Sequence, residues 1–349
     1  MGYNFVVKNS TKFLRKNGFI RITKCWEGYL IPKTIEKIGY LTVGYVNFGY
    51  YGKAIGSVRQ NVYDGDTINV STKKNFGIRF LGVDAAEMKI PLPKSRAFTS
   101  LSSQGWIDFL TDPFAANYGD FDPALDPGLK THLQNSSGAN VATNHKHHAD
   151  EAEDALEKLI TDDMATLGKT KDDFEFFLAF AQEIMDGYGR FLCFINGNQP
   201  DATDPEPRPL SYNERLMIEG QVSPYFIWPN IDPYRPKKGS LRKSVVKSGG
   251  ANTEANASAT MKRAREGVKD ARQKKKGIFD DIYPLAIQPF EVRFLSRRKP
   301  PNRWLIDLGK NGDTLVKPQD YYTITNLEDR LYIPDEYVPL FVEEGWKMP

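Results

Sequence analysis

The chain has 349 residues, which is enough for two domains or for one domain with large insertions. Hydrophobic residues make up 40% of it and aromatic residues 12%, so the chain can build a real core, and wholesale disorder is excluded. It contains 47 Lys and Arg against 44 Asp and Glu, a net charge of +3, and therefore has no global basic signature. Any anionic partner must be bound by a local patch.

The two cysteines, Cys25 and Cys193, are too few and too far apart for a disulfide framework or a structural zinc site, so we expect buried free thiols. No apolar run approaches the ~18–20 residues of a membrane span, and the N-terminus lacks the apolar centre of a secretory signal. Residues 1–24 are basic without an acidic residue, but strand-like sequence follows too closely for a cleaved transit peptide.

The first quarter of the chain is predicted to be β-rich. Alternating apolar residues punctuated by Gly, Asn and Asp predict strands at 19–23, 40–51, 57–70 and 76–83. Residues 90–148 then lose this pattern among Pro, Asp, Gly and Asn clusters, apart from a possible short helix near 97–110. We expect a long insertion with little core of its own.

Apolar residues at helical spacing predict a helix over 149–167, with acidic residues in its first turns. The remaining predicted elements are strands at 174–180 and 190–196, a helix at 210–221, a loop at 236–259, a basic helix at 260–276, and strands at 290–296, 303–309 and 320–325. We expect residues 282–349 to form a separate tail.

Three segments, 62–70, 78–89 and 186–192, place four carboxylates and two arginines near strand ends and turns: Asp64, Asp66, Asp84, Glu87, Arg79 and Arg190. Such a set suits metal-assisted attack on a phosphodiester, because carboxylates hold a hard cation and orient water while arginines bind the phosphate. Taken singly, each segment is also ordinary turn sequence.

Taken together and in order, these segments resemble the staphylococcal nuclease (thermonuclease) family. The resemblance implies calcium ligands at Asp66, Asp84 and the Ala85 carbonyl, a general base at Glu87, and phosphate-binding arginines at Arg79 and Arg190. Ala85-Ala86 stands where the family usually has Thr-Pro, and Asp64 is expected only to support the turn. The resemblance also implies a substrate-binding role for the aromatic residues Tyr188, Phe226 and Trp228.

The implied protein is a calcium-dependent phosphodiesterase that hydrolyses DNA or RNA. Its expected fold is α+β, a five-stranded OB-type barrel with three helices. The expected boundaries are a basic and β-rich extension at 1–52, a nuclease-like domain at 53–281 with insertions at 90–148 and 231–258, and a β-rich extension at 282–349.

The competing class is a structural component of a large assembly, such as a phage virion or tail, that carries a nuclease-like fold in active or inactive form. Residues 1–24 and 282–349 would then dock other proteins. Either class places the protein inside a cell or in a virion, and the sequence specifies neither compartment nor host.

Two further features have alternative interpretations. All four histidines, His132, His145, His147 and His148, fall in the 90–148 insertion, where they indicate either a transition-metal site or, as we expect, a solvated loop. Residues 231–276 contain 14 Lys or Arg and four acidic residues, which predicts either a strip that binds nucleic acid or a merely solvated face.

Overall fold

The computed structural model describes residues 34–38, 41–44, 46–62, 68–72, 75–198, 210–231 and 241–349. The chain divides into two compact units, of which the first comprises Met1–Gly77 with Met185–Phe191 and the second Ile78–Ile184 with Leu192–Pro349. The described elements mix helices and strands, which confirms an α+β protein. Their strands form no closed barrel within the described residues. Cys25, Asp64, Asp66 and the expected strand at 19–23 lie outside the described residues.

The first unit contains short antiparallel strand pairs: β1 (Ile35–Ile38) with β2 (Leu41–Gly44), β3 (Val46–Phe48) with β6 (Val70–Thr72), and β4 (Tyr50–Tyr51) with β5 (Ala54–Ile55). The single strand expected over 57–70 is wrong, because a helical turn, α1 (Val58–Asn61), begins there. Ser57 accepts a hydrogen bond from the Gln60 backbone, and Gln60 bonds back to Ser57, so a capping box starts this turn.

The second unit is organised around a mixed sheet with the strand order β14 (Trp304–Asp307), β15 (Arg330–Ile333), β13 (Ser223–Ile227) and β8 (Gly82–Asp84). β13 runs antiparallel to β8 and parallel to β15. The tail is therefore not a separate extension, because two of its strands complete the sheet that begins at β8. Other strands form the sheet β11 (Phe176–Met185), β12 (Phe191–Gly197), β7 (Ile78–Phe80) and the ribbon β9 (Lys89–Pro91), β10 (Phe98–Ser100).

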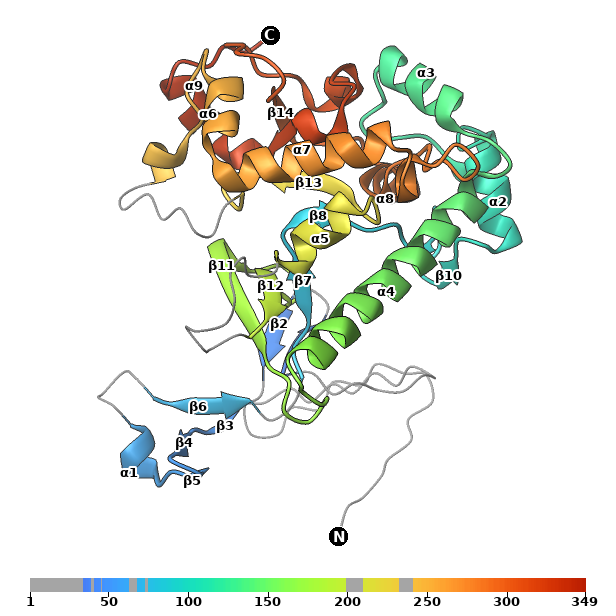
Figure 1. Cartoon of the computed structure of the whole chain (residues 1–349). Helices are drawn as coiled ribbons and strands as arrows, with labels where there is room; N and C mark the ends of the chain where they lie inside the picture. The colour runs from blue at the N-terminus through green and yellow to red at the C-terminus, as the bar shows by residue number, and fades with distance from the viewer. Residues whose placement is uncertain are drawn as a thin grey trace. The chain divides into compact units, whose positions relative to one another are not determined.

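Some helices of the second unit contact this sheet, whereas those at the right of Figure 1 pack on other helices. The helices of this unit are α2 (Gln104–Thr111), α3 (Pro127–Ser136), α4 (Val141–Thr166), α5 (Tyr212–Ile218), α6 (Ala251–Ala257), α7 (Ala259–Gln273), α8 (Pro289–Arg297) and α9 (Val338–Glu343). α5 contacts both α4 and α7. The expected helices at 149–167, 210–221 and 260–276 are confirmed, whereas α6 replaces part of the expected loop at 236–259. None of the described helices is long and apolar enough to cross a membrane.

The expectation that 90–148 lacks a core is wrong. Trp106, Phe109 and Leu133 are completely buried, in a cluster that also contains Val292 of α8 and Tyr332 of β15. The insertion thus builds its core against residues about two hundred positions later, which local patterning does not show. A second cluster gathers β13, α5, α7 and α9 around Trp228.

Two expected strands of the tail are helical. Residues 290–296 belong to α8, which begins with a capping box between Gln288 and Glu291 and has Pro289 in its first turn. Residues 320–325 overlap a 3₁₀ helix, Pro318–Thr323. The strand expected at 303–309 is confirmed as β14, and β15 was not expected.

Candidate active site

The end of β8 brings three of the predicted site residues together. Leu81 donates its backbone N–H to the Cys193 carbonyl, and Gly82, with φ at 75°, then turns the chain from β7 into β8. This turn brings Arg79 back to Asp84, whose Oδ1 lies 2.6 Å from Arg79 Nη2. Asp84 itself is only 1% exposed.

A fourth residue, Arg293 of α8, joins the group and was missed by the sequence analysis. Its Nη1 and Nη2 donate to Oδ1 and Oδ2 of Asp84 at 2.9 and 2.7 Å, and Nη1 also donates to Glu87 Oε1 at 2.6 Å. Burial disfavours the charged guanidinium, but Asp84 and Glu87 outweigh it and raise the pKa of Arg293 above its ordinary value. Arg293 is therefore a fixed cation between the two carboxylates.

His145 supports the backbone of this group. The Glu87 N–H donates to His145 Nε2 at 2.7 Å, and burial lowers the pKa of His145 to about 3. The imidazole is neutral and carries its proton on Nδ1, because Nε2 is the acceptor. The histidine cluster is thus not a solvated loop, since His145, His147 and His148 lie on α4, which begins eight residues before the expected helix. Within the described ranges, no three or more His, Cys, Asp or Glu side chains are grouped to hold a metal.

This burial predicts a pH dependence of stability. The unfolded chain takes up a proton on His145 near pH 6.5, whereas the folded chain does so only near pH 3, so the contribution is complete above pH 6.5 and falls as the pH is lowered. By pH 5 the loss should be roughly 2 kcal/mol in the free energy of unfolding. Urea unfolding of wild type and His145→Gln at several pH values measures it. If the free energy of unfolding depended on pH equally in both proteins, His145 would not be the buried group that loses stability at low pH.

The described carboxylates do not fit a calcium ion. Calcium needs oxygen ligands that are free to face it, but both Asp84 oxygens accept hydrogen bonds from guanidinium groups. Arg293 already supplies the positive charge between Asp84 and Glu87. Asp66 lies outside the described residues, so the expected pairing of Asp66 with Asp84 is not described.

Arg190 and Tyr188 belong to the first unit, whereas Arg79, Asp84 and Glu87 belong to the second. Arg190 donates from Nε to Asp186 Oδ2 at 2.8 Å, and the Tyr188 and Arg190 backbones donate to Asp186 Oδ1. Asp186 therefore organises the tight turn that carries both residues. The Tyr188 side chain is 58% exposed on this turn.

The burial of Phe226 and Trp228 contradicts the substrate-binding role that the resemblance implies for them. They are 3% and 0% exposed, and Trp228 packs edge-on against Tyr337 and Phe341 of the tail, with ring centroids 4.9 and 5.0 Å away. Both are core residues. Tyr225, which precedes Phe226 on β13, instead stacks on Phe290 of α8 with the ring centroids 5.6 Å apart.

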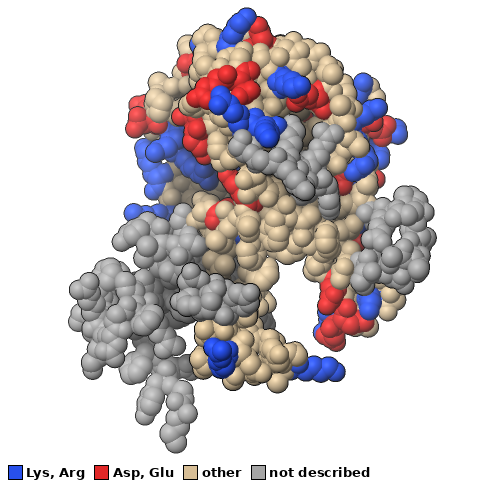
Figure 2. Space-filling view, turned by 90° about the vertical axis from the view of Figure 1, so that its left-hand side faces the viewer, with Lys and Arg blue, Asp and Glu red and all other residues tan. Residues whose placement is uncertain are grey.

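The described part of the basic strip is largely neutralised. Figure 2 shows basic and acidic side chains interspersed on the face that it presents. Seven cations of α7 and the residues after it pair with carboxylates: Lys262 with Glu266, Arg263 with Glu214, Arg265 with Asp329, Arg272 with Glu328, Lys274 with Asp270, Lys275 with Asp281 and Lys276 with Glu219. This strip is therefore mainly a set of ion pairs that attach α7 to its neighbours, and its expected role as a nucleic-acid surface is weakened.

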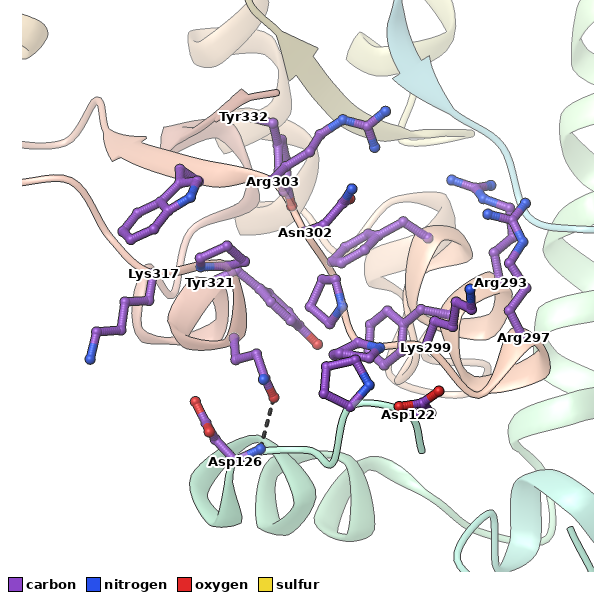
Figure 3. Close-up of a pocket in the computed structure, with 18 of the residues that line it drawn as sticks. Asp122, Asp126, Arg293, Arg297, Lys299, Asn302, Arg303, Lys317, Tyr321 and Tyr332 are labelled. Atoms are coloured by element: carbon purple, nitrogen blue, oxygen red, sulfur yellow. Dashed lines mark hydrogen bonds between the residues drawn. The ribbon is translucent and has the colours of Figure 1, made fainter. Parts of the chain in front are cut away.

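A cavity of about 640 Å³ opens on the other side of Arg293. Arg297, Arg303 and Lys317 line it together with tyrosine and phenylalanine rings. Figure 3 shows Arg293 and Arg297 projecting from one side, Lys317 from the opposite side, and Tyr321 between them. Arg293 thus belongs both to the carboxylate group and to the cavity wall.

No family model matches the chain, and no curated protein matches its sequence. The site is therefore interpreted from its own geometry: two carboxylates, two guanidiniums and an adjoining cationic cavity.

Proposed function

We propose that this chain is a nuclease that hydrolyses phosphodiester bonds of DNA or RNA at the group formed by Arg79, Asp84, Glu87 and Arg293. The observation that carries this proposal is the Arg293 guanidinium, which bridges Asp84 and Glu87 while Arg79 contacts Asp84. Two acids and two guanidiniums within hydrogen-bond distance are the groups needed to bind a phosphate and activate water.

The arginines can exchange one anion for another. A guanidinium fork matches a phosphate as well as it matches a carboxylate, and the side chains of Arg79 and Arg293 are 33% and 20% exposed. A phosphodiester that takes hydrogen bonds from both arginines would release the Glu87 carboxylate. Glu87 would then be free to act as a base at the moment when substrate is bound.

The reaction uses Glu87, the two arginines and water alone. The water oxygen forms a bond to phosphorus and gives one proton to Glu87, while the bond from phosphorus to the 5′-oxygen breaks. The released oxygen takes a proton from solvent, and Glu87 later returns its proton to solvent. Arg79 and Arg293 stabilise the charge that builds on the phosphate oxygens.

The proposal includes the OB-type barrel and the additional residues that the resemblance implies. It rests on the resemblance of residues 78–89 and 186–192, which contain β7, β8 and the start of β12. Arg190 is proposed as a second phosphate-binding arginine and Tyr188 as a nucleotide contact, both carried on the turn that Asp186 organises.

Glu87→Gln should slow cleavage of a labelled oligonucleotide by about 10²–10⁴-fold, because the amide cannot accept the proton from water. Glu151→Gln, an exposed carboxylate on α4, is the matched control and should cleave as wild type does. Because the proposed reaction uses no metal, cleavage of DNA or RNA should persist when calcium is replaced by chelator, and loss of cleavage in chelator would contradict this mechanism. Equal rates for wild type and Glu87→Gln would remove Glu87 from the reaction.

A second candidate function is that of a structural component of a large assembly, such as a phage virion. Large apolar side chains of the first unit are exposed, among them Tyr50, Tyr51, Ile55 and Val58, at 61–66%. Exposed apolar groups of this kind often mark a protein interface. Analytical ultracentrifugation of wild type and Tyr51→Ser would test whether they mediate assembly.

A further inference from the structure

The cavity beside Arg293 contains cations that carboxylates do not neutralise. Arg297, Lys299, Arg303 and Lys317 line it, and none of them forms an ion pair with a described acidic side chain. Asp122 and Asp126 also line the cavity but pair with none of these cations. This distinguishes the cavity from α7, where most cations are paired, and gives it a local positive potential.

Aromatic rings form much of the remaining wall. Tyr225 and Phe290 stack with their centroids 5.6 Å apart and their planes at 18°, and the Arg303 guanidinium donates to the Tyr225 hydroxyl at 2.8 Å. Phe290 and Trp304 are only partly buried, so they present ring surface to the cavity. Flat apolar rings beside uncompensated cations suit a ligand that combines a planar base with a phosphate.

We infer that this cavity binds a nucleoside phosphate unit, with the base against Phe290 and Trp304 and the phosphate bound by one of the wall cations Lys299, Arg303 and Lys317, which Figure 3 shows spread around the cavity. Its volume of about 640 Å³ lies in the range of small-molecule sites. These wall residues lie in 282–349, outside the three segments that resemble the nuclease family. The choice of ligand class rests on the proposed function.

The position of the cavity explains what such binding would achieve. Arg293 lines the cavity and also bonds Asp84 and Glu87, so a strand held there lies next to the proposed catalytic group. A nucleotide fixed in the cavity would direct the next phosphodiester of the same strand toward Arg79 and Glu87. A nucleoside phosphate unit can belong to a nucleic-acid strand or to a free nucleotide, and the experiment distinguishes these two ligands.

The test measures binding of a labelled single-stranded oligonucleotide by fluorescence anisotropy, with Glu87→Gln added to every protein so that the oligonucleotide is not appreciably cleaved during the measurement. Lys299→Gln/Lys317→Gln removes two exposed cavity cations and should weaken binding by about ten-fold or more. Lys243→Gln/Lys247→Gln is the matched control, because it removes two exposed lysines of the second unit that also form no ion pair with a described acidic side chain and do not line the cavity. Equal affinities of the two double variants would overturn the inference. Matching thermal unfolding curves confirm that both variants are folded.

Competition by adenosine monophosphate distinguishes the two sources. If adenosine monophosphate displaces the oligonucleotide at a concentration comparable to that of the oligonucleotide, the cavity is a site for a free nucleotide. If adenosine monophosphate does not displace it, but the cavity variant still weakens oligonucleotide binding, the cavity binds a strand. Binding of duplex alone would overturn the inference, because a paired base cannot enter the cavity.

Failure of this inference is separable from failure of the proposed function. Cavity-dependent binding without any cleavage by wild type would leave the cavity site standing and overturn the nuclease. Cleavage by wild type together with unchanged oligonucleotide affinity in Lys299→Gln/Lys317→Gln would overturn the cavity site and leave the nuclease standing.

Discussion

Arg293→Gln should lower the free energy of unfolding by about 3–5 kcal/mol. Asp84 is 1% exposed, and Arg293 donates to both of its oxygens, so the substitution leaves a buried carboxylate with Arg79 as its remaining charged partner. Glu87 also loses its guanidinium contact. Urea unfolding at neutral pH, followed by circular dichroism, measures the change, and an unaltered denaturant slope would show that the two-state comparison is valid.

Arg297→Gln is the matched control for this prediction. Arg297 lies on the same helix but is exposed and makes no ion pair among the described residues, so its replacement should change stability by less than about 0.5 kcal/mol. Adding Asp84→Asn to Arg293→Gln removes the unpaired charge and should recover part of the loss. Arg293→Gln as stable as wild type would show that α8 does not hold the carboxylate group in solution.

Deletion of residues 282–349 should abolish cooperative unfolding of the second unit. The segment contributes β14 and β15 to the central sheet and buries large side chains in both clusters, including Leu305, Tyr332 and Phe341. Each such side chain contributes about 1.5–3 kcal/mol when fully buried, so losing several of them exceeds the 5–15 kcal/mol that typically stabilises a domain. Thermal unfolding and limited proteolysis of the truncated chain measure this result.

Removal of Met348 and Pro349 alone is the control, because both are exposed and the buried Trp346 stays in place. That variant should keep a sharp unfolding transition. A truncated chain ending near 281 that is soluble and unfolds cooperatively would show instead that the tail is a separate extension, as the sequence pattern indicated.

The local part of the site could be predicted from sequence. Arg79, Asp84 and Glu87 lie within nine residues of one another, so one turn at Gly82 is enough to gather them. Arg293 is 209 residues from Asp84, and no pattern in one sequence reports a contact at that distance. Its helix was also mistaken for a strand, because Phe290, Val292, Phe294 and Leu295 resemble strand residues. The capping box between Gln288 and Glu291 was the signal that could have identified the helix.

The aromatic predictions failed for a related reason. Phe226 and Trp228 were assigned to a nucleotide pocket by the order of motifs, but burial depends on what packs over a strand. Tyr337 and Phe341, more than a hundred residues later, cover Trp228. The same long-range packing gives the insertion its core and makes the tail part of the central sheet.

Cleavage by wild type and Glu87→Gln under saturating oligonucleotide, with affinity measured separately by anisotropy, tests the central claim most directly, because turnover at saturation does not depend on affinity. The account predicts that wild type cleaves, that Glu87→Gln binds with similar affinity, and that its turnover is lower by about 10² or more. No cleavage by wild type, or turnover of Glu87→Gln within about two-fold of wild type, would contradict a phosphodiesterase site at Arg79, Asp84 and Glu87.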